Sequence, residues 1–240
     1  MKRLSVLLAS AMALLLSSCG NEPAKQEDKT ADTTAAASVP PPAPEKPVFT
    51  PYKVIMIQHH VKNFDTWEAA YFAHDSVRKA YGITPGVIGR DLKDTNLVYV
   101  ADKIEDLAKA QSFAALPNLK DAMKKGGVTD KPGFSYAEMV RADDSPVGTN
   151  DRLGVAHHVK DYATWLKAFD GEGAATRAAN GIVDRGLARG LVDSNMVYIT
   201  FAVTDMAKAK ARFASPELKK LMTDAGVDSP PTTRWYKVVK

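Results

Sequence analysis

HHVKNFDTW at residues 59–67 and HHVKDYATW at residues 157–165 are two copies of one stretch, and they decide how this chain folds. Six of their nine positions are identical. Each copy has the pattern of a strand end, a polar turn and a helix start. The likeness extends downstream, where 106–128 and 205–227 share 11 of 23 aligned residues. The sequence therefore contains a duplicated supersecondary unit.

Each unit predicts the element order strand, helix, strand, strand, helix, strand. The β-branched run at 53–61 predicts the first strand, and Asn63 is expected to cap the helix that follows. In the second unit Asp161 takes the place of Asn63. The remaining elements expected in the first unit are strands at 86–92 and 96–102, a helix at 104–125 broken near Pro117, and a strand at 134–140.

This order is that of the ferredoxin-like βαββαβ unit, so the fold class is α+β. Such a unit covers one face of its sheet with helices and leaves the other face bare, and the twin unit is the obvious cover. We expect repeats at 51–141 and 151–240, packed sheet to sheet into one barrel with the helices outside. The polar segment between them is a linker.

Composition fits an ordinary soluble domain, with 45% hydrophobic and 25% charged residues among 240. The formal net charge is +4, with 32 basic and 28 acidic residues. Removing a leader that contains Lys2 and Arg3 leaves 30 basic residues and a charge of +2. No basic patch is implied, so nucleic acid is not an expected partner.

The first 50 residues predict export and membrane attachment. Residues 1–18 have the cationic, apolar and small-residue parts of a secretory signal peptide. The residues ending at Cys19, LSSC, resemble the lipobox of bacterial lipoproteins, which implies acylation of Cys19 and a lipid bilayer as partner. The alternative is an ordinary signal peptide with Cys19 near its cleavage site. Residues 19–50 bury nothing and predict a disordered tether, and Gly20 favours the outer membrane by the same resemblance.

Three motifs carry a resemblance to a known superfamily: HxVxDYxxW, the strand pair RxLxDxNxVY and SPELKxxMxxAGV. Together they resemble the dimeric α/β-barrel superfamily, which includes antibiotic-biosynthesis-monooxygenase-like proteins, over nearly all of 52–240. The resemblance implies that two units which are usually separate subunits are fused here. One chain would then close its own barrel and could remain a monomer. It fixes no activity, because this scaffold carries oxygenases, haem enzymes, isomerases and proteins without catalysis.

Strand alternation predicts which residues line the barrel. Ile55, Ile57 and His59 share one face of the first strand and are expected to face the helices. Gln58, His60 and His158 would then face the interior, where Gly154 and Ala156 leave room. A cavity of this kind is the default ligand site. His60 and His158 are candidate acid–base groups, although the commoner role of a strand-end histidine is to hydrogen-bond the next turn.

Two further residue pairs recur at matching strand positions. Arg90 and Arg189 have two readings of equal weight: a clamp for a carboxylate or phosphate in the cavity, or edge-strand arginines with solvated head groups. Tyr99 and Tyr198 are expected to face inward, where they fill the barrel or orient a polar ligand.

The functions that these residues allow fall into three classes. We expect first a membrane-tethered envelope protein that binds a small apolar or polar–apolar ligand in the barrel and has no clear catalytic signature. The second is a cofactor-independent monooxygenase or isomerase of the same fold, and the third is an envelope protein–protein interaction module. No cofactor or metal is expected, because neither metal-ligand spacing nor a haem-degrading arrangement can be matched residue by residue.

Overall fold

The computed structural model describes residues 49–240, and eight strands within them close into one barrel. The first repeat consists of β1 (Tyr52–His60), α1 (Phe64–Ala73), α2 (Asp75–Ala80), β2 (Ile83–Asp91), β3 (Leu97–Ile104), α3 (Leu107–Ala114), α4 (Pro117–Lys125) and β4 (Gly133–Ala142). The second consists of β5 (Asp151–His158), α5 (Tyr162–Glu172), α6 (Ala174–Ala179), β6 (Ile182–Gly190), β7 (Met196–Val203), α7 (Met206–Ala214), α8 (Pro216–Asp224) and β8 (Thr232–Val238). The predicted α+β architecture is confirmed.

The barrel closes at two places where a strand of one repeat pairs with a strand of the other. Around the barrel the order is β1-β3-β2-β8-β5-β7-β6-β4, and every pairing is antiparallel. The β2–β8 seam pairs Gly89–Asp91 with Tyr236–Val238, and the β4–β6 seam pairs Ala137–Ala142 with Gly186–Gly190. The bare faces of the two sheets thus turn toward each other, as the βαββαβ order predicted.

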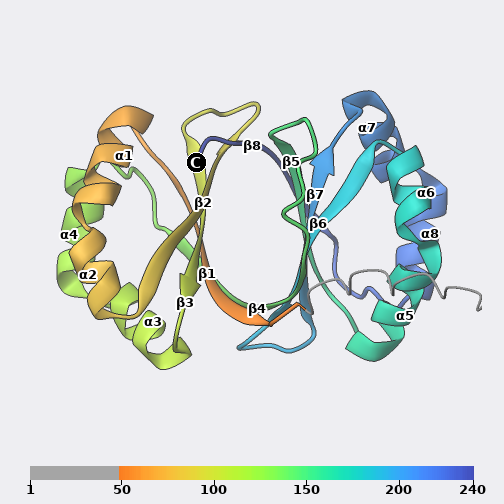
Figure 1. The fold of residues 1–240 in the computed structure, drawn as a ribbon, viewed down its shortest axis with the longest axis horizontal. Helices are drawn as coiled ribbons and strands as arrows, with labels where there is room; N and C mark the ends of the chain where they lie inside the picture. The colour runs from red at the N-terminus through yellow and green to blue at the C-terminus, as the bar shows by residue number, and fades with distance from the viewer. Residues whose placement is uncertain (1–48) are drawn as a thin grey trace, which may run out of the picture. The chain divides into compact units, whose positions relative to one another are not determined.

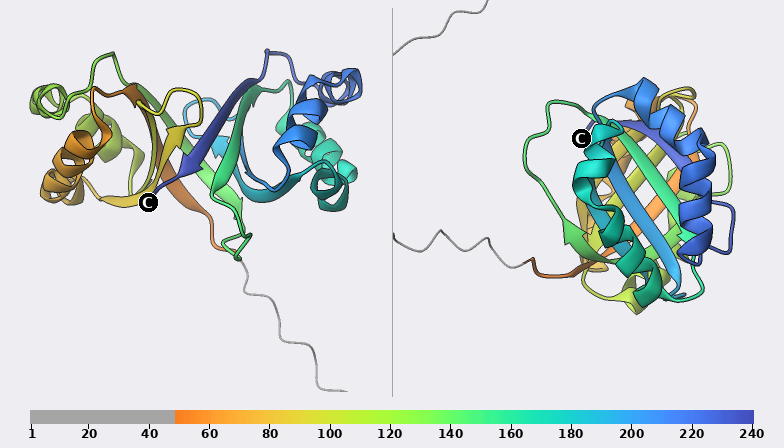
Figure 2. Two further views of the ribbon diagram at one scale, coloured as in Figure 1. Left: turned by 90° about the horizontal axis from the view of Figure 1, so that it is seen from above. Right: turned by 90° about the vertical axis from the view of Figure 1, so that its right-hand side faces the viewer.

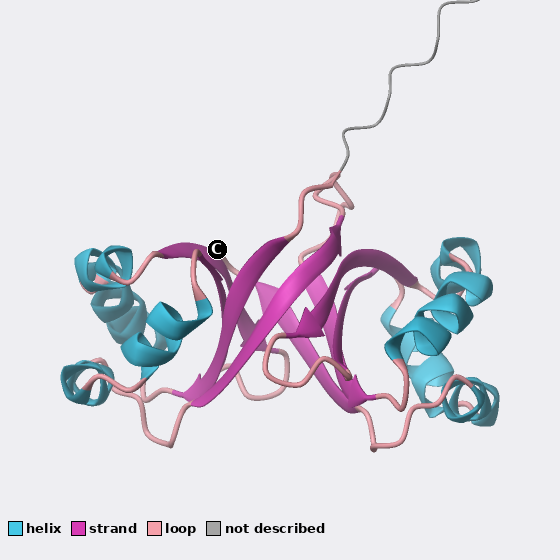
Figure 3. Ribbon diagram, turned by 90° about the horizontal axis from the view of Figure 1, so that it is seen from below, coloured by secondary structure: helices cyan, strands magenta, loops and turns pink. Residues whose placement is uncertain are grey.

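The helices lie outside the barrel in two separate layers. Figure 1 shows α1–α4 on one side of the strands and α5–α8 on the other, and Figures 2 and 3 show the same layers from other directions. The core of each repeat lies between its own sheet and its own helices. Trp67 and Trp165 are 4% and 3% exposed at the centre of these two cores.

Local capping explains where the helices begin. The side chains of Asn63 and Asp161 accept hydrogen bonds from the backbone N–H groups of Thr66 and Thr164, as expected for N-caps. The helix predicted from residue 104 begins instead at Leu107. Asp106 caps it, and Ile104 still belongs to β3.

The alternation of β1 is as expected. Ile55, Ile57 and His59 pack against the helices, and His59 is 1% exposed beside Trp67, with 5.4 Å between the ring centres. His157 repeats this contact with Trp165 at 5.6 Å. These two imidazoles belong to the helix–sheet cores and not to the barrel interior.

The predicted signal peptide, Cys19 and nearly all of the predicted tether lie outside the described residues. Among the residues that are described, no helix is long and apolar enough to cross a membrane.

Candidate functional site

The barrel interior contains a cavity of about 400 Å³. Both repeats contribute to its wall, which is largely apolar and carries a few polar side chains. The polar and aromatic lining residues include Gln58, Tyr99, Ser135, Tyr198, Thr200, Thr232, Arg234 and Tyr236. Apolar ligand pockets with a few placed polar groups have this composition and size.

Arg234 on β8 and Gln58 on β1 form the main polar contact across the cavity. The Nε–H of Arg234 donates to Oε1 of Gln58 at 2.5 Å. The guanidinium carbon also lies 5.9 Å from the ring centre of Tyr99 on β3. The two hydrogen-bonding residues come from different repeats, so the site exists only because the two halves close one barrel.

The wall residue Tyr99 forms a second polar contact, with Asp91, which is not itself a lining residue. The hydroxyl of Tyr99 donates to Oδ2 of Asp91 at 3.1 Å, and burial followed by the nearby Asp91 charge raises the pKa of the phenol. The ring of Tyr236 lies 5.4 Å from that of Tyr99, and burial raises the pKa of Tyr236 as well. Both phenols are therefore protonated at neutral pH and can act as hydrogen-bond donors.

The other part of the barrel interior is filled. Val54, Ala137 and Ala188 are at most 5% exposed and form an apolar cluster there, with Met139 packed against it. This cluster lies beside the β4–β6 seam. The cavity is consequently displaced toward the β2–β8 seam, which gives the pseudo-symmetric barrel one asymmetric site.

Three predicted lining residues do face the cavity. Gln58, Tyr99 and Tyr198 are part of its wall, and Gly154 and Ala156 leave the expected space on β5. Whether any of these residues binds a ligand stays a prediction.

The placement of His60 and His158 on the inner wall is wrong. Neither lines the cavity, and their side chains are 43% and 33% exposed at the ends of β1 and β5. Nδ1 of His60 lies 2.6 Å from Oδ2 of Asp130, and Nδ1 of His158 lies 2.6 Å from Oδ1 of Asp228. These hydrogen bonds raise the pKa of both histidines. The side chains turn away from the interior because loop carboxylates bind them at the strand ends.

Arg90 and Arg189 also lie outside the cavity, so of their two readings the clamp inside the cavity does not fit their positions. The guanidinium carbon of Arg90 lies 4.3 Å from the ring centre of Phe64, and its Nε–H donates to the hairpin oxygen of Thr95 at 2.8 Å. Arg189 lies in the same way over Tyr162, also at 4.3 Å. In both repeats the arginine stacks on the first helical residue because its strand position faces the helices.

Sequence reasoning missed Arg234, Tyr236 and Asp91. Alternation within the last strand, TTRWYKV, places Thr232, Arg234 and Tyr236 on one face and could have predicted two of them. Alternation along β2 also places Asp91 on the inward face, because its neighbour Arg90 faces the helices, but its contact with Tyr99 depends on the pairing of β2 with β3.

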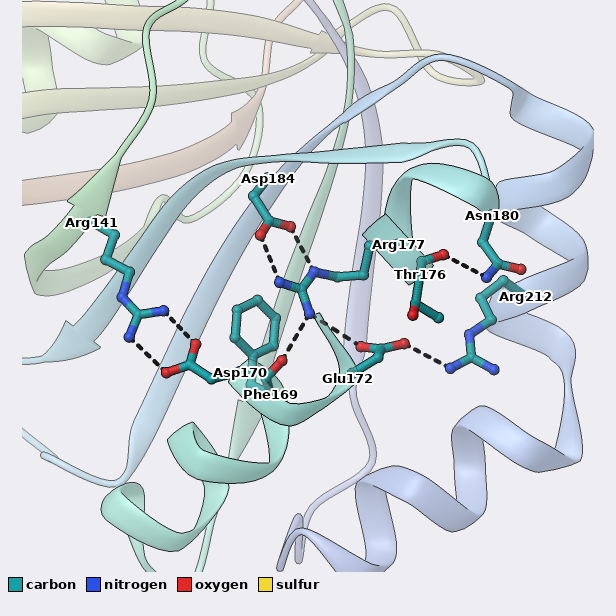
Figure 4. Close-up of polar contacts among 9 residues, drawn as sticks. All are labelled: Arg141, Phe169, Asp170, Glu172, Thr176, Arg177, Asn180, Asp184 and Arg212. Carbon is teal, nitrogen blue, oxygen red and sulfur yellow. Dashed lines mark hydrogen bonds and ion pairs between the residues drawn. The ribbon is translucent and has the colours of Figure 1, made fainter. Parts of the chain in front are cut away.

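A separate polar cluster lies under the helices of the second repeat (Figure 4). Arg177, which is 5% exposed on its side chain, donates to both carboxylate oxygens of Asp184 at 2.7 and 2.6 Å. Arg141 of β4 reaches across to Asp170 of α5 and links the repeats. These are structural contacts. The pockets beneath the helices, at about 60 and 50 Å³, are much smaller than the barrel cavity.

Within residues 49–240 there is no group of three or more histidine, cysteine, aspartate or glutamate residues that could hold a metal ion.

Comparisons with known proteins support the fold through solved structures and do not assign the sequence to a family. Neither the protein-family models nor the curated proteins gave a match to this sequence. Among solved structures, an anthrone oxidase-like protein is similar with a TM-score of 0.52 and 14% identity, over 79% of this chain and 92% of that one.

Two further solved structures have lower scores. A proposed monooxygenase from Fusobacterium nucleatum subsp. nucleatum has a TM-score of 0.49 and 14% identity, over 79% of this chain and 93% of that one. A ferredoxin-fold protein from Listeria monocytogenes, related to antibiotic biosynthesis monooxygenases, has a TM-score of 0.43 and 11% identity, over 80% of this chain and 97% of that one. The barrel topology and the anthrone oxidase-like structure support a ferredoxin-like α/β barrel in its doubled form, and at 14% identity the similarity extends to the fold alone.

Proposed function

We propose that the protein binds a small, mainly apolar molecule in the barrel cavity. The observation that carries this proposal is the cavity of about 400 Å³. Its walls are mostly apolar, and polar groups of both repeats face into it. A barrel used only as a scaffold gains stability by filling its interior, because an unfilled apolar cavity costs free energy. The filled β4–β6 side shows that this chain can fill its barrel.

Ala156→Phe tests the proposal because it places a ring in the cavity. Native mass spectrometry of the full chain, recovered from the cells that express it, should detect a bound small molecule in the wild type and lose it in Ala156→Phe. Ala69→Phe, on the exposed side of α1, is the matched control and should keep the molecule. A wild-type protein with no bound molecule, or equal retention in Ala156→Phe, would contradict ligand binding in the barrel.

Catalysis in the same cavity is the second candidate function, and the Tyr99–Asp91 contact favours it. With Tyr99 displaced by substrate, the Asp91 carboxylate could accept a proton from an acidic C–H group, and Arg234 could stabilise the resulting anion. If that anion reacts with dioxygen, the protein is a cofactor-independent monooxygenase. If the anion is instead reprotonated at another carbon, the protein is an isomerase. The anthrone oxidase-like structure has this fold and suggests a test substrate.

Oxygen uptake with anthrone as the C–H acid tests this second candidate. The wild type should consume oxygen faster than the uncatalysed reaction, and Asp91→Asn should lose on the order of 100-fold, as expected for removal of a general base. Equal uptake by the wild type and Asp91→Asn would exclude this role for Asp91.

The N-terminal signals extend the proposal to cellular location. A lipobox ending at Cys19 supports acylation and attachment to the cell envelope, with the barrel held off the outer membrane by residues 19–50. Cys19→Ser should move the protein from the membrane fraction to the soluble fraction. If the variant stays in the membrane fraction to the same extent, attachment through Cys19 is wrong.

A further inference from the structure

Arg234 is the one formally charged residue among those that line the barrel cavity. It forms no ion pair with any of the residues that the structure describes, 49–240. The one side-chain hydrogen bond that it forms there is the contact from Nε–H to Oε1 of Gln58 at 2.5 Å. A charge held in an apolar cavity without a counter-charge is unfavourable, so this cavity favours an anionic ligand.

The carboxylate of Asp91, which contacts the wall residue Tyr99, is already used by other donors. Oδ1 of Asp91 accepts from the backbone N–H groups of Lys93 and Asp94 at 2.8 and 3.0 Å, and Oδ2 accepts from Tyr99. The contacts of Asp91 therefore hold the β2–β3 hairpin and leave Arg234 without a carboxylate partner.

The Gln58 contact also orients the guanidinium. Because Oε1 of Gln58 accepts from Nε, the amide NH₂ of Gln58 and the terminal nitrogens of Arg234 remain as donors at the cavity. The protonated phenol of Tyr236 also faces the cavity, whereas the hydroxyl of Tyr99 already donates to Asp91. The cavity is thus rich in donors and carries a positive charge, which is the arrangement that binds a carboxylate or another oxyanion.

We infer that the ligand of the barrel cavity is an apolar organic anion whose carboxylate or other oxyanion binds Arg234. This inference rests on the proposed binding function and names the chemical class of its ligand. Gln58 is a positioning residue in this arrangement, because it acts by fixing the guanidinium. The apolar remainder of the ligand lies against walls such as Met56, Ala101 and Met196.

A pair of probes that differ in charge and not in shape tests the inference: 2-naphthoate and its uncharged isostere 2-naphthamide. Isothermal titration calorimetry on the full chain should give at least tenfold tighter binding of 2-naphthoate to the wild type. Arg234→Gln should reduce the affinity for 2-naphthoate to that for 2-naphthamide and leave 2-naphthamide within about twofold, since the lost contact is a charge-assisted hydrogen bond. Arg234→Lys, which keeps the charge, should retain part of the preference.

Arg90→Gln is the matched control, because Arg90 lies on β2, which pairs with β8, on the face turned toward the helices. It should leave both affinities unchanged. Equal binding of the two probes to the wild type, or an unchanged preference in Arg234→Gln, would overturn the anion inference alone. Failure of both probes to bind the wild type at millimolar concentration would overturn the cavity as a binding site and the inference with it. The wild-type comparison decides the matter even if a variant does not fold.

Discussion

The two repeats share a buried histidine–tryptophan pair against their helices and carry different residues inside the barrel. His59 and His157 are both buried beside a tryptophan, whereas Gln58 and Ala156, one position earlier, differ. Arg234 likewise matches the small Ser135 of the first repeat by strand register. Close packing constrains the helix side, because a change of one methylene there is costly. The hollow imposes no such constraint, so the two halves could become different and form one asymmetric site.

The helix layers contain a second difference. In the first repeat Asp102 is fully buried, and both of its oxygens accept from the hydroxyl of Tyr71. Burial raises the pKa of Asp102. In the second repeat Arg177 and Asp184 carry the polar contacts instead. The same fold therefore tolerates two arrangements of buried polar groups.

The largest expected effect comes from the feature that the repeats share. Burial lowers the pKa of His59 and His157 from 6.5 to about 4, so the folded protein keeps both imidazoles neutral. Between pH 6.5 and 4 the unfolded chain binds more protons than the folded one. The free energy of unfolding should therefore decrease as the pH is lowered from 6.5 to 4. The loss is about 3 kcal/mol for each histidine over this interval. Urea unfolding at several pH values measures it.

His59→Phe and His157→Phe separate the contributions of the two repeats to this pH dependence. Each variant should flatten the dependence by a similar amount, because the two sites are alike. The exposed His60 and His158, with raised pKa values, act in the opposite direction and are present in all variants. A slope that neither variant changes would show that the buried imidazoles are not its source.

The next effect distinguishes the repeats. Asp184→Ala removes the carboxylate that accepts two hydrogen bonds from the buried Arg177. We expect a loss of about 2 to 3 kcal/mol in the free energy of unfolding. Asp75→Ala is the matched change in the first repeat, where Asp75 approaches Arg78 at 3.3 Å. It should cost clearly less, because Asp75 is partly exposed to solvent. Equal losses by urea unfolding would mean that the two clusters contribute alike.

The smallest expected effect concerns the cavity wall. A Cβ added at Gly89 would lie 2.4 Å from Cδ2 of Tyr236, whereas one at Gly154 would lie 3.5 Å from Cε1 of the same ring. Gly89→Ala should displace the ring, cost about 1 to 2 kcal/mol and weaken 2-naphthoate binding. Gly154→Ala should change both quantities little. Calorimetric titration and urea unfolding of the two variants give the comparison, and similar behaviour would show that Tyr236 yields without cost.

The sequence determined the duplicated α+β fold, the caps at Asn63 and Asp161, and the inward faces of Gln58, Tyr99 and Tyr198. Repeats and strand alternation are local patterns, so they can be read along the chain. The tertiary structure alone decided the direction of side chains at strand ends and hairpins. Loop carboxylates distant in sequence turn His60 and His158 outward, and β8 brings Arg234 to Gln58 across 176 positions. Such contacts depend on which strands meet when the barrel closes, and no local pattern records that.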